Sequence, residues 1–253
     1  MPATGTRKKN AAFVLGVDGC PKGWLAVRLF PHRGVPQSVE QTIFSNFNDL
    51  LRSEWGQAEL VLIDMPIGLA DHGRRGCDTL ARRKLGKGRA ASVFPAPRRP
   101  MLEFATYEAA NAWGKAQGKD AGGGLSKQAW NILPKIRELD ACLTPDLQEV
   151  VREAHPEVAF LRLNDGSPVV APKRKLAGQQ QRARLLEANG LMNLNRTWQQ
   201  LAAEHRRQAA KLDDYYDACA LALTASSICL DQPVLHLTEN LTDQRGLKME
   251  IWG

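Results

Sequence analysis

The stretch Phe13-Val14-Leu15-Gly16-Val17-Asp18-Gly19-Cys20 is an apolar run that leads into a carboxylate. An apolar run of this length indicates a strand that is buried on both faces of a sheet. Gly19 and the following Pro21 indicate a turn directly after it. We therefore expect Asp18 at the end of a central strand. A carboxylate is costly to bury there unless it is paired or binds a metal ion, so Asp18 is the first candidate catalytic residue.

A second apolar run, residues 60–63, repeats this pattern and ends in Asp64. Between the two runs, residues 24–30 and 38–44 are predicted strands that form an antiparallel meander with the first, and a short helix follows them. With a crossover helix before it, the strand at 60–63 should lie parallel to the first strand. Asp18 and Asp64 would then share the sheet edge at which open α/β sheets bind ligands.

The composition is that of an ordinary soluble globular protein: of 253 residues, 43% are hydrophobic and 24% are charged. The formal net charge of +7 favours an anionic partner, with nucleic acid (DNA or RNA) or phosphorylated substrates first. The five cysteines have no CxxC spacing, which argues against a zinc site and, with no signal peptide, for the cytoplasm. No apolar run reaches membrane-spanning length, so no membrane partner is expected. The oligomeric state is open, with a homodimer as one alternative.

We expect a single α/β domain over residues 13–253, preceded by a disordered basic tail at residues 1–12. Arg and Lys residues crowd between residues 74 and 99, and helical patterns follow, which predicts a basic helical insertion at about 70–145. Such a charge run is by default a solvated face, but at a catalytic edge it also suits phosphate contacts. The candidate substrate-binding residues are Lys22, Arg75, Arg82, Arg83 and Lys135.

The strongest helical pattern covers residues 206–229 and carries Asp213, Asp214 and Asp217. Residues three or four apart face the same way on a helix, so Asp214 and Asp217 can point together. Their carboxylates need a counter-charge, which Mg²⁺ or Mn²⁺ can supply because hard cations prefer oxygen ligands. Two such ions roughly 4 Å apart can activate a water and stabilise the leaving oxygen of a phosphodiester. The candidate metal ligands are Asp18, Asp64, Asp214 and Asp217.

Residues 149–163 are predicted to form a further strand that ends near Pro156 or lies at an edge, because proline cannot donate to a ladder. At a period of two, Glu153, His155 and Glu157 share one face of that strand, and all three are candidate catalytic residues. The default role of His155 is that of a hydrogen-bonded edge residue rather than a base. A basic helix, or a loop followed by a helix, is expected over residues 173–188.

Taken together, six stretches resemble the DUF429 family, whose members are described as predicted nucleases of ribonuclease H-like fold. The similarity extends from residue 13 to about residue 230. It is carried by Gly16-Val17-Asp18-Gly19-Cys20-Pro21-Lys22-Gly23-Trp24, Ile63-Asp64-Met65-Pro66-Ile67-Gly68-Leu69, Cys77-Asp78 with Ala81-Arg82, Ser92-Val93-Phe94, Glu153-Ala154-His155-Pro156-Glu157 and Asp213-Asp214-Tyr215-Tyr216-Asp217-Ala218.

The resemblance implies a ribonuclease H-like fold, with a mixed five-stranded sheet flanked by helices. Asp18 of this sequence matches the metal ligand on the first strand of such nucleases, and Asp64 matches the acid on their fourth strand. Asp214 and Asp217 match the paired acids on the last helix of resolvase-like members. Glu153 and Glu157 belong to the pattern of the closer family, in which either can replace or supplement a ligand.

The first interpretation is therefore a metal-dependent nuclease or phosphodiesterase that cleaves nucleic acid by water attack between two metal ions. An ATP-dependent phosphotransferase of the actin and sugar-kinase type is an alternative, although 253 residues without an internal repeat are short for its two duplicated domains. A non-catalytic nucleic-acid-binding module is a third interpretation. The fourth is a small-molecule hydrolase, with residues 94–100 as a lid over its pocket.

Overall fold

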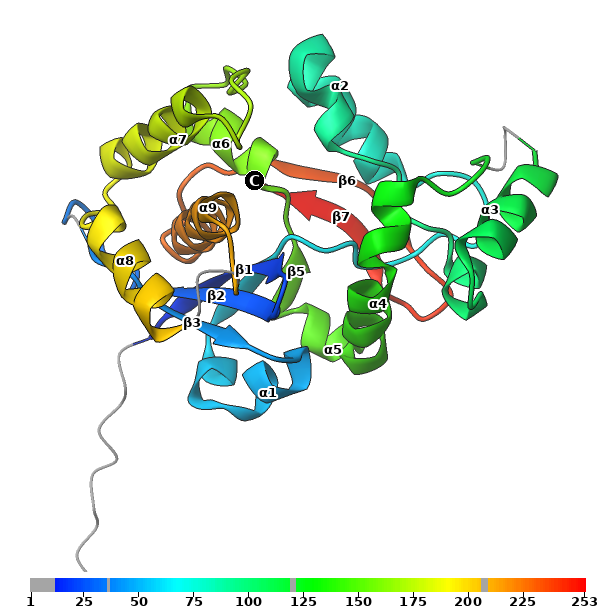
Figure 1. Cartoon of the computed structure of the whole chain (residues 1–253), viewed down its shortest axis with the longest axis horizontal. Helices are drawn as coiled ribbons and strands as arrows, with labels where there is room; N and C mark the ends of the chain where they lie inside the picture. The colour runs from blue at the N-terminus through cyan, green and yellow to red at the C-terminus, as the bar shows by residue number, and fades with distance from the viewer. Residues whose placement is uncertain (1–11, 36, 119–121, 206–208) are drawn as a thin grey trace, which may run out of the picture.

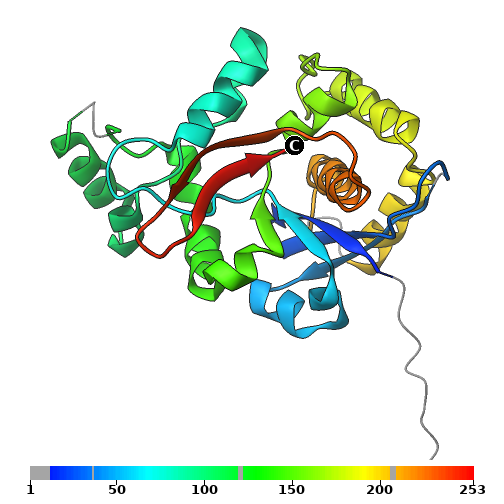
Figure 2. The ribbon, with the colours of Figure 1, turned by 180° about the vertical axis from the view of Figure 1, so that it is seen from behind.

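The computed structural model describes residues 12–35, 37–118, 122–205 and 209–253 (Figure 1). The tail expected at residues 1–12 lies outside this part of the chain except for Ala12, so the tail stays a prediction. The described chain is a mixed α/β structure in which helices cover both faces of a central sheet (Figures 1 and 2). None of the helices in the described ranges is long and apolar enough to cross a membrane.

The central sheet has five strands in the order β3-β2-β1-β4-β5. These strands are β1 (Val14–Cys20), β2 (Gly23–Leu29), β3 (Glu40–Phe44), β4 (Leu60–Ile63) and β5 (Val151–Glu153). The pairs β1–β2 and β2–β3 are antiparallel, which confirms the predicted meander. The pairs β1–β4 and β4–β5 are parallel. The chain returns between β3 and β4 through α1 (Phe47–Arg52) and the 3-10 helix η1 (Glu54–Gln57), as a parallel neighbour requires.

An apolar core lies on each face of the sheet, because alternate residues of a strand point to opposite faces. Val14 of β1 belongs to the core beneath α9 (Leu212–Cys229), in which β1, β2 and β4 contribute side chains. Leu15 belongs to the opposite core, which α1 and α4 (Lys127–Cys142) cover. Figure 1 shows α9 and α1 on opposite sides of the sheet. The sheet is therefore the middle layer between two helical layers.

Three more helices enclose α9 on the sides that do not touch the sheet (Figure 1). They are α6 (Pro156–Leu163), α7 (Leu176–Ala188) and α8 (Leu194–Glu204). As a result, α9 is buried over most of its surface. Any charged side chain on this helix is consequently held in a low-dielectric interior and needs a partner.

The region between β4 and β5 contains most of the remaining helices, which stand beside the sheet (Figures 1 and 2). They are α2 (Gly76–Arg89), η2 (Ala90–Ser92), η3 (Arg99–Glu103), α3 (Tyr107–Ala116), α4 and α5 (Pro145–Gln148). This region is largely helical and lies at the carboxyl end of β4, so it forms one wall of the space in front of Asp64.

The strand predicted within residues 149–163 exists, lies at the edge of the sheet and ends before Pro156, but its predicted extent to residue 163 is wrong. The strand β5 ends at Glu153, and α6 begins at Pro156. Proline suits the first helical position because its φ angle is preset and its missing N–H is not needed there. The Nδ1 atom of His155 accepts the N–H of Glu157 and caps the helix. Glu153 and Glu157 therefore lie on different elements and do not share the face of a strand.

The last predicted helix is also shorter than expected. In the structure α9 begins at Leu212, and residues 206–208 of the predicted range lie outside the described chain. The carboxylate Oδ2 of Asp214 accepts the backbone N–H of Lys211 at 2.9 Å, so Asp213 and Asp214 lie in the first turn of the helix, whereas Asp217 lies inside it. Acidic side chains in a first turn are favoured by the helix dipole.

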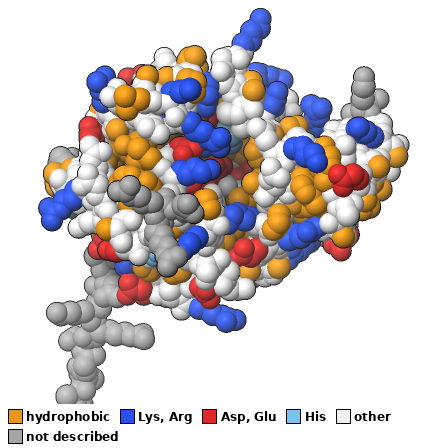
Figure 3. Space-filling view, in the orientation of Figure 1, with side chains coloured by type: hydrophobic (Ala, Val, Ile, Leu, Met, Phe, Trp, Pro, Cys, Tyr) orange, Lys and Arg blue, Asp and Glu red, His pale blue; other side chains and the backbone are white. Residues whose placement is uncertain are grey.

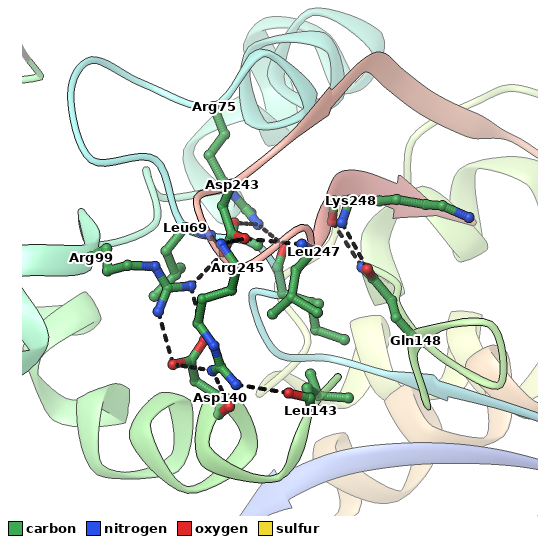
Figure 4. A network of polar contacts seen from close by, with 12 residues as sticks. Leu69, Arg75, Arg99, Asp140, Leu143, Gln148, Asp243, Arg245, Leu247 and Lys248 are labelled. Atoms are coloured by element: carbon green, nitrogen blue, oxygen red, sulfur yellow. Dashed lines mark hydrogen bonds and ion pairs between the residues drawn. The ribbon is translucent and has the colours of Figure 1, made fainter. Parts of the chain in front are cut away.

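A hairpin of β6 (His236–Thr242) and β7 (Lys248–Trp252) closes the described chain. Asp243 in its turn accepts the N–H groups of Arg245 at 2.8 Å and of Leu69 and Leu247 at 3.0 Å (Figure 4). The side chain of Arg99 also pairs with Asp243, and it binds Asp140 of α4 through a second nitrogen at 2.9 Å. The network fastens the hairpin to α4 and to the loop that follows Asp64.

Candidate functional site

Three carboxylates from three separate elements meet at the edge of the sheet. One oxygen each of Asp18, Asp64 and Asp217 lies within 4.8 Å of the other two. We call these three residues the acidic cluster. Asp18 lies on β1, and the N–H of Asp64 donates to the carbonyl of Val17 at 2.9 Å. Because Val17 pairs with Ile63 in the parallel register, the two acids that follow them lie side by side.

The third acid reaches the cluster because α9 packs very closely on β1. A Cβ atom on Gly16 would overlap the carbonyl oxygen of Ala218 and the amide nitrogen of Ala222. The absence of a side chain at Gly16 therefore allows the helix backbone to lie directly on the strand, two residues from Asp18. Asp217 precedes the contact residue Ala218 and is only 1% exposed.

Among the described residues, one cationic side chain forms an ion pair with the acidic cluster: Lys173, from the segment between α6 and α7. The Nζ atom of Lys173 lies 2.5 Å from Oδ2 of Asp217. The other carboxylate oxygen of Asp217, Oδ1, is buried and accepts no hydrogen bond from the described residues. A buried oxygen without a donor is unfavourable, so this atom is the point at which a cation would add most.

Burial and mutual repulsion perturb all three carboxyl groups. Burial, with Asp64 and Asp217 close by, raises the pKa of Asp18 well above its ordinary value. Burial also raises the pKa of Asp64, and it raises the pKa of Asp217 to about 7 although Lys173 opposes the change. Burial alone would lower the pKa of Lys173, but Asp217 and Asp18 raise it, so this side chain stays an ammonium. When all three groups are ionised, one ammonium leaves two negative charges uncompensated, and either protonation or a bound cation can offset them.

The acidic cluster lies on the wall of a cleft of about 660 Å³. Figure 3 shows acidic side chains around a hollow near the middle of this face, with Lys and Arg side chains beside them. The positively charged residues that line the cleft are Arg75, Arg89, Lys135, Lys173, Arg174 and Lys211. The cleft thus combines carboxylate oxygens with cationic side chains, of which Arg75, Arg89 and Lys173 are paired with acids.

Asp214, the fourth predicted metal ligand, lines the cleft but is not one of the three converging acids. Its carboxylate caps α9 through the N–H of Lys211. Asp213 lies away from the cluster, is 5% exposed, and has Arg174 Nε at 3.7 Å as its ion-pair partner. The pair of acids expected on the helix is therefore divided, with Asp217 in the cluster and Asp214 at the helix start.

Glu153 and the predicted substrate-binding residue Arg75 are bound to each other. Nη1 and Nη2 of Arg75 donate to the two oxygens of Glu153 at 2.6 and 2.7 Å, and Nη2 also donates to Asp78 at 2.5 Å. Glu153 in addition accepts the N–H of Ile67 at 2.6 Å. All three charged side chains are buried. They form a paired network behind the loop that follows Asp64, and the guanidinium of Arg75 is committed to it.

Glu157 is paired in a similar way. Its Oε1 atom accepts Nη2 of the fully buried Arg182 at 2.6 Å, and Arg89 also pairs with it. Its Oε2 atom is buried and has no donor among the described residues. Glu157 lines the cleft near the acidic cluster, where its charge contributes to the raised pKa of Asp64.

His155 lines the cleft beside Asp64. Its Nδ1 atom accepts the N–H of Glu157 at 3.2 Å, which leaves Nε2 as the nitrogen not used by the cap. Lys135 also lines the cleft, where its Nζ atom donates to the carbonyl of Gly23 at 2.5 Å. Among the predicted substrate-binding residues, Lys22, Arg82 and Arg83 do not line the cleft.

Sequence reasoning missed the cationic residues that hold this site together. Lys173 and Arg182 fell inside a stretch predicted as a basic helix or as a loop followed by a helix, and nothing in their spacing pointed to Asp217 or Glu157. Asp78, which accepts a hydrogen bond from Arg75 together with Glu153, was noted from the sequence only as part of a family motif. Arg182 and Glu157 are 25 positions apart in the sequence, and Arg75 and Glu153 are 78 positions apart. Only the folded chain brings these residues into contact.

Comparison with known proteins was made at the levels of family, sequence and structure. A family model described as Protein of unknown function (DUF429) matches residues 16–240, a range that includes the acidic cluster and Lys173. A search of curated proteins gave no match, and a search of solved structures gave none.

Proposed function

The chain belongs to the DUF429 family, and from this premise we propose that it is a metal-dependent phosphodiesterase of ribonuclease H-like fold that acts on nucleic acid. The proposed fold rests on the strand order β3-β2-β1-β4-β5, with an antiparallel meander followed by two parallel strands. The proposed reaction rests on the acids at the edge of that sheet, because a fold alone does not determine an activity.

The observation that carries the proposal is the acidic cluster itself. Three carboxylates with oxygens within 4.8 Å of one another match the preference of Mg²⁺ and Mn²⁺ for oxygen ligands. The buried Oδ1 atom of Asp217 accepts no hydrogen bond from described residues, so it is free to act as an oxygen ligand of such an ion. Asp18, Asp64 and Asp217 would hold the metal ion.

A bound ion of this kind would polarise a phosphoryl oxygen and lower the pKa of a coordinated water. The residues of the chain supply binding and orientation. Arg174 and Lys211 line the same cleft and can neutralise the phosphates on either side of the scissile bond. His155, next to Asp64, has one ring nitrogen outside the helix cap and can accept or donate a proton in the cleft.

The test is a cleavage assay with labelled DNA, RNA and branched DNA in the presence of Mn²⁺ or Mg²⁺. We expect cleavage by the wild type that a chelator abolishes and that Asp18→Asn reduces to background. Asp146→Asn is the matched control, because Asp146 is an exposed aspartate on α5, outside the cleft. Cleavage by Asp18→Asn at the wild-type rate would remove the proposal.

A second candidate is hydrolysis of a small phosphodiester. The cleft volume of about 660 Å³ lies within the range of small-molecule pockets. Phe94, Gln128 and Asn131 also line it and could hold one base, whereas the exposed Arg83 and Lys22 lie outside. Measuring kcat/KM against substrates from a dinucleotide to a long oligonucleotide separates the two. A value that rises with length favours nucleic acid, and a constant value from the dinucleotide onward favours the small substrate.

A further inference from the structure

We propose that Lys173 takes the position of a second cation in the acidic cluster, so that the site binds one divalent metal ion and not two. This inference rests on the proposed function, since it assumes that the acidic cluster is a metal site. It departs from the two-ion arrangement that acids of this kind suggest from sequence. The ammonium of Lys173 would supply the positive charge that a second metal ion would otherwise provide.

Buried residues fix the position of the segment that carries Lys173. The fully buried Arg182 donates from Nη1 to the carbonyl of Ala171 at 3.0 Å, two residues before Lys173. A Cβ on Gly178 would overlap the carbonyl oxygen of Pro172, so this part of the segment lies directly on α7. The N–H of Lys175 donates to the same Pro172 carbonyl at 3.0 Å. The backbone on both sides of Lys173 is therefore fixed against α7.

The two oxygens of Asp217 differ in their contacts. Oδ2 lies 2.5 Å from the ammonium of Lys173, whereas Oδ1 is buried and accepts no hydrogen bond from the described residues. Asp217 can thus offer one oxygen to a metal ion without releasing Lys173. If Asp217 bridged two ions with one oxygen on each, Lys173 would have to leave a contact in which its partner is 1% exposed.

The charges of the acidic cluster and Lys173 also match one divalent ion. Asp18, Asp64 and Asp217 carry three negative charges when ionised, and Lys173 contributes one positive charge. The remaining two negative charges match one divalent ion. Two neighbouring acids have cationic partners of their own, because Asp213 pairs with Arg174 and Glu157 pairs with Arg182 and Arg89. Asp214 is not one of the three converging acids and accepts the backbone N–H of Lys211 at the start of α9.

The arrangement has a functional consequence. The side chain of Lys173 is 35% exposed and lines the cleft, so its ammonium reaches an anionic ligand as well as Asp217. With the ammonium of Lys173 fixed in the site, the activity of the site would depend on the binding of one metal ion.

The experiment counts Mn²⁺ ions per chain by calorimetric titration, with free Mn²⁺ measured independently by electron paramagnetic resonance. It uses the full chain and four variants. Lys173→Met and Lys173→Gln remove the ammonium, whereas Lys173→Arg retains a positive charge. Lys175→Met is the matched control, because it removes an exposed lysine from the same segment outside the cleft. Thermal melting without metal shows which variants are folded.

We expect one Mn²⁺ per chain for the wild type, Lys173→Arg and Lys175→Met, and a second Mn²⁺ for Lys173→Met and Lys173→Gln. Equal numbers in the wild type and both neutral variants, whether one or two, would overturn the role of Lys173 and leave the metal site itself intact. Absence of Mn²⁺ binding in every folded protein would overturn the metal site and, with it, this inference. The two failures are therefore distinguishable.

Discussion

Gly16 of β1 lies so close to Ala218 of α9 that a Cβ atom on Gly16 would overlap the Ala218 carbonyl oxygen. The contact joins the strand that carries Asp18 to the helix that carries Asp217. It is a backbone-to-backbone contact, which cannot relax by rotation of a side chain. The distance between two acids of the cluster is thus set by a residue that carries no chemistry of its own.

We expect Gly16→Ala to lower the free energy of unfolding by about 3 kcal/mol, at the upper end of the cost of overpacking, because β1 and α9 must separate. Urea denaturation measures the change. Gly88→Ala is the control, since its new Cβ would meet only the Val170 side chain at 3.8 Å. If Gly16→Ala is as stable as Gly88→Ala, the close packing of α9 on β1 is not as described.

We expect Arg75→Met to destabilise the fold by about 3 kcal/mol or more, because it leaves Glu153 and Asp78 buried without their partner. Arg74→Met, which changes an exposed neighbour, is the control. Equal unfolding midpoints for the two variants in urea would show that Arg75 is not structural, and would return it to the predicted phosphate-binding role.

The deficit of Arg75→Met should also grow with pH. Burial raises the pKa of Glu153 to about 7 even with Arg75 opposing it, and removal of Arg75 would raise it further. A carboxyl group whose pKa is higher in the folded than in the unfolded chain favours folding when protonated, and this contribution is lost as pH rises. Unfolding measured from about pH 5 to about pH 8 should therefore show a widening gap from the wild type. A gap that narrows over this range would contradict the buried pairing.

The opposite pH dependence is expected for Asp243. Burial alone would raise its pKa, but the N–H groups of Leu69 and Leu247 and the side chain of Arg99 hold the pKa of Asp243 below its ordinary value. A carboxyl group whose pKa is lowered by folding stabilises the fold above its unfolded pKa, and this contribution is lost as pH falls.

Asp243→Asn should therefore cost about 2 kcal/mol near neutral pH, as loss of charged hydrogen bonds does. The difference from the wild type should shrink below about pH 4. Urea unfolding at both pH values measures it, with Asp231→Asn as a control outside the network of Figure 4. A difference that stays constant with pH would mean that the charge of Asp243 is not what its donors stabilise.

The position of the phosphate-binding residues can be tested with a matched pair of arginines. Arg174 lines the cleft, whereas Arg83 is exposed and lies outside it. We expect Arg174→Met to weaken binding of a short oligonucleotide roughly fivefold, or about 1 kcal/mol, and Arg83→Met to leave it unchanged. Fluorescence anisotropy at fixed salt measures both. A larger effect at Arg83 would place the nucleic acid on the basic face that the sequence indicated.

Part of this structure could be predicted from local sequence. The runs ending in Asp18 and Asp64 each combine a buried strand with a costly carboxylate, and this pattern indicated the meander and the parallel strand. Residues 149–163 misled because Glu153, His155 and Glu157 alternate as in a strand. Pro156 both ends a strand and starts a helix, and here the helix is formed.

The pairing of buried charges could not be predicted in the same way. Arg75 was expected to face phosphate because it lies in a run of basic residues, yet its partner Glu153 comes from β5. Lys173 reaches Asp217 only because Arg182 and Gly178 hold its segment on α7. Whether an arginine or a lysine is solvated or buried depends on contacts distant in sequence, and periodicity does not report them.

The measurement that tests the central proposal most directly is the anomalous diffraction of Mn²⁺ in crystals grown with the ion. We expect a peak within coordination distance of oxygens of Asp18, Asp64 and Asp217, and no such peak in crystals of Asp18→Asn. Well-ordered crystals of the wild type with no Mn²⁺ among these three carboxylates, at concentrations that saturate a magnesium-type site, would contradict the assignment of the acidic cluster as a metal centre.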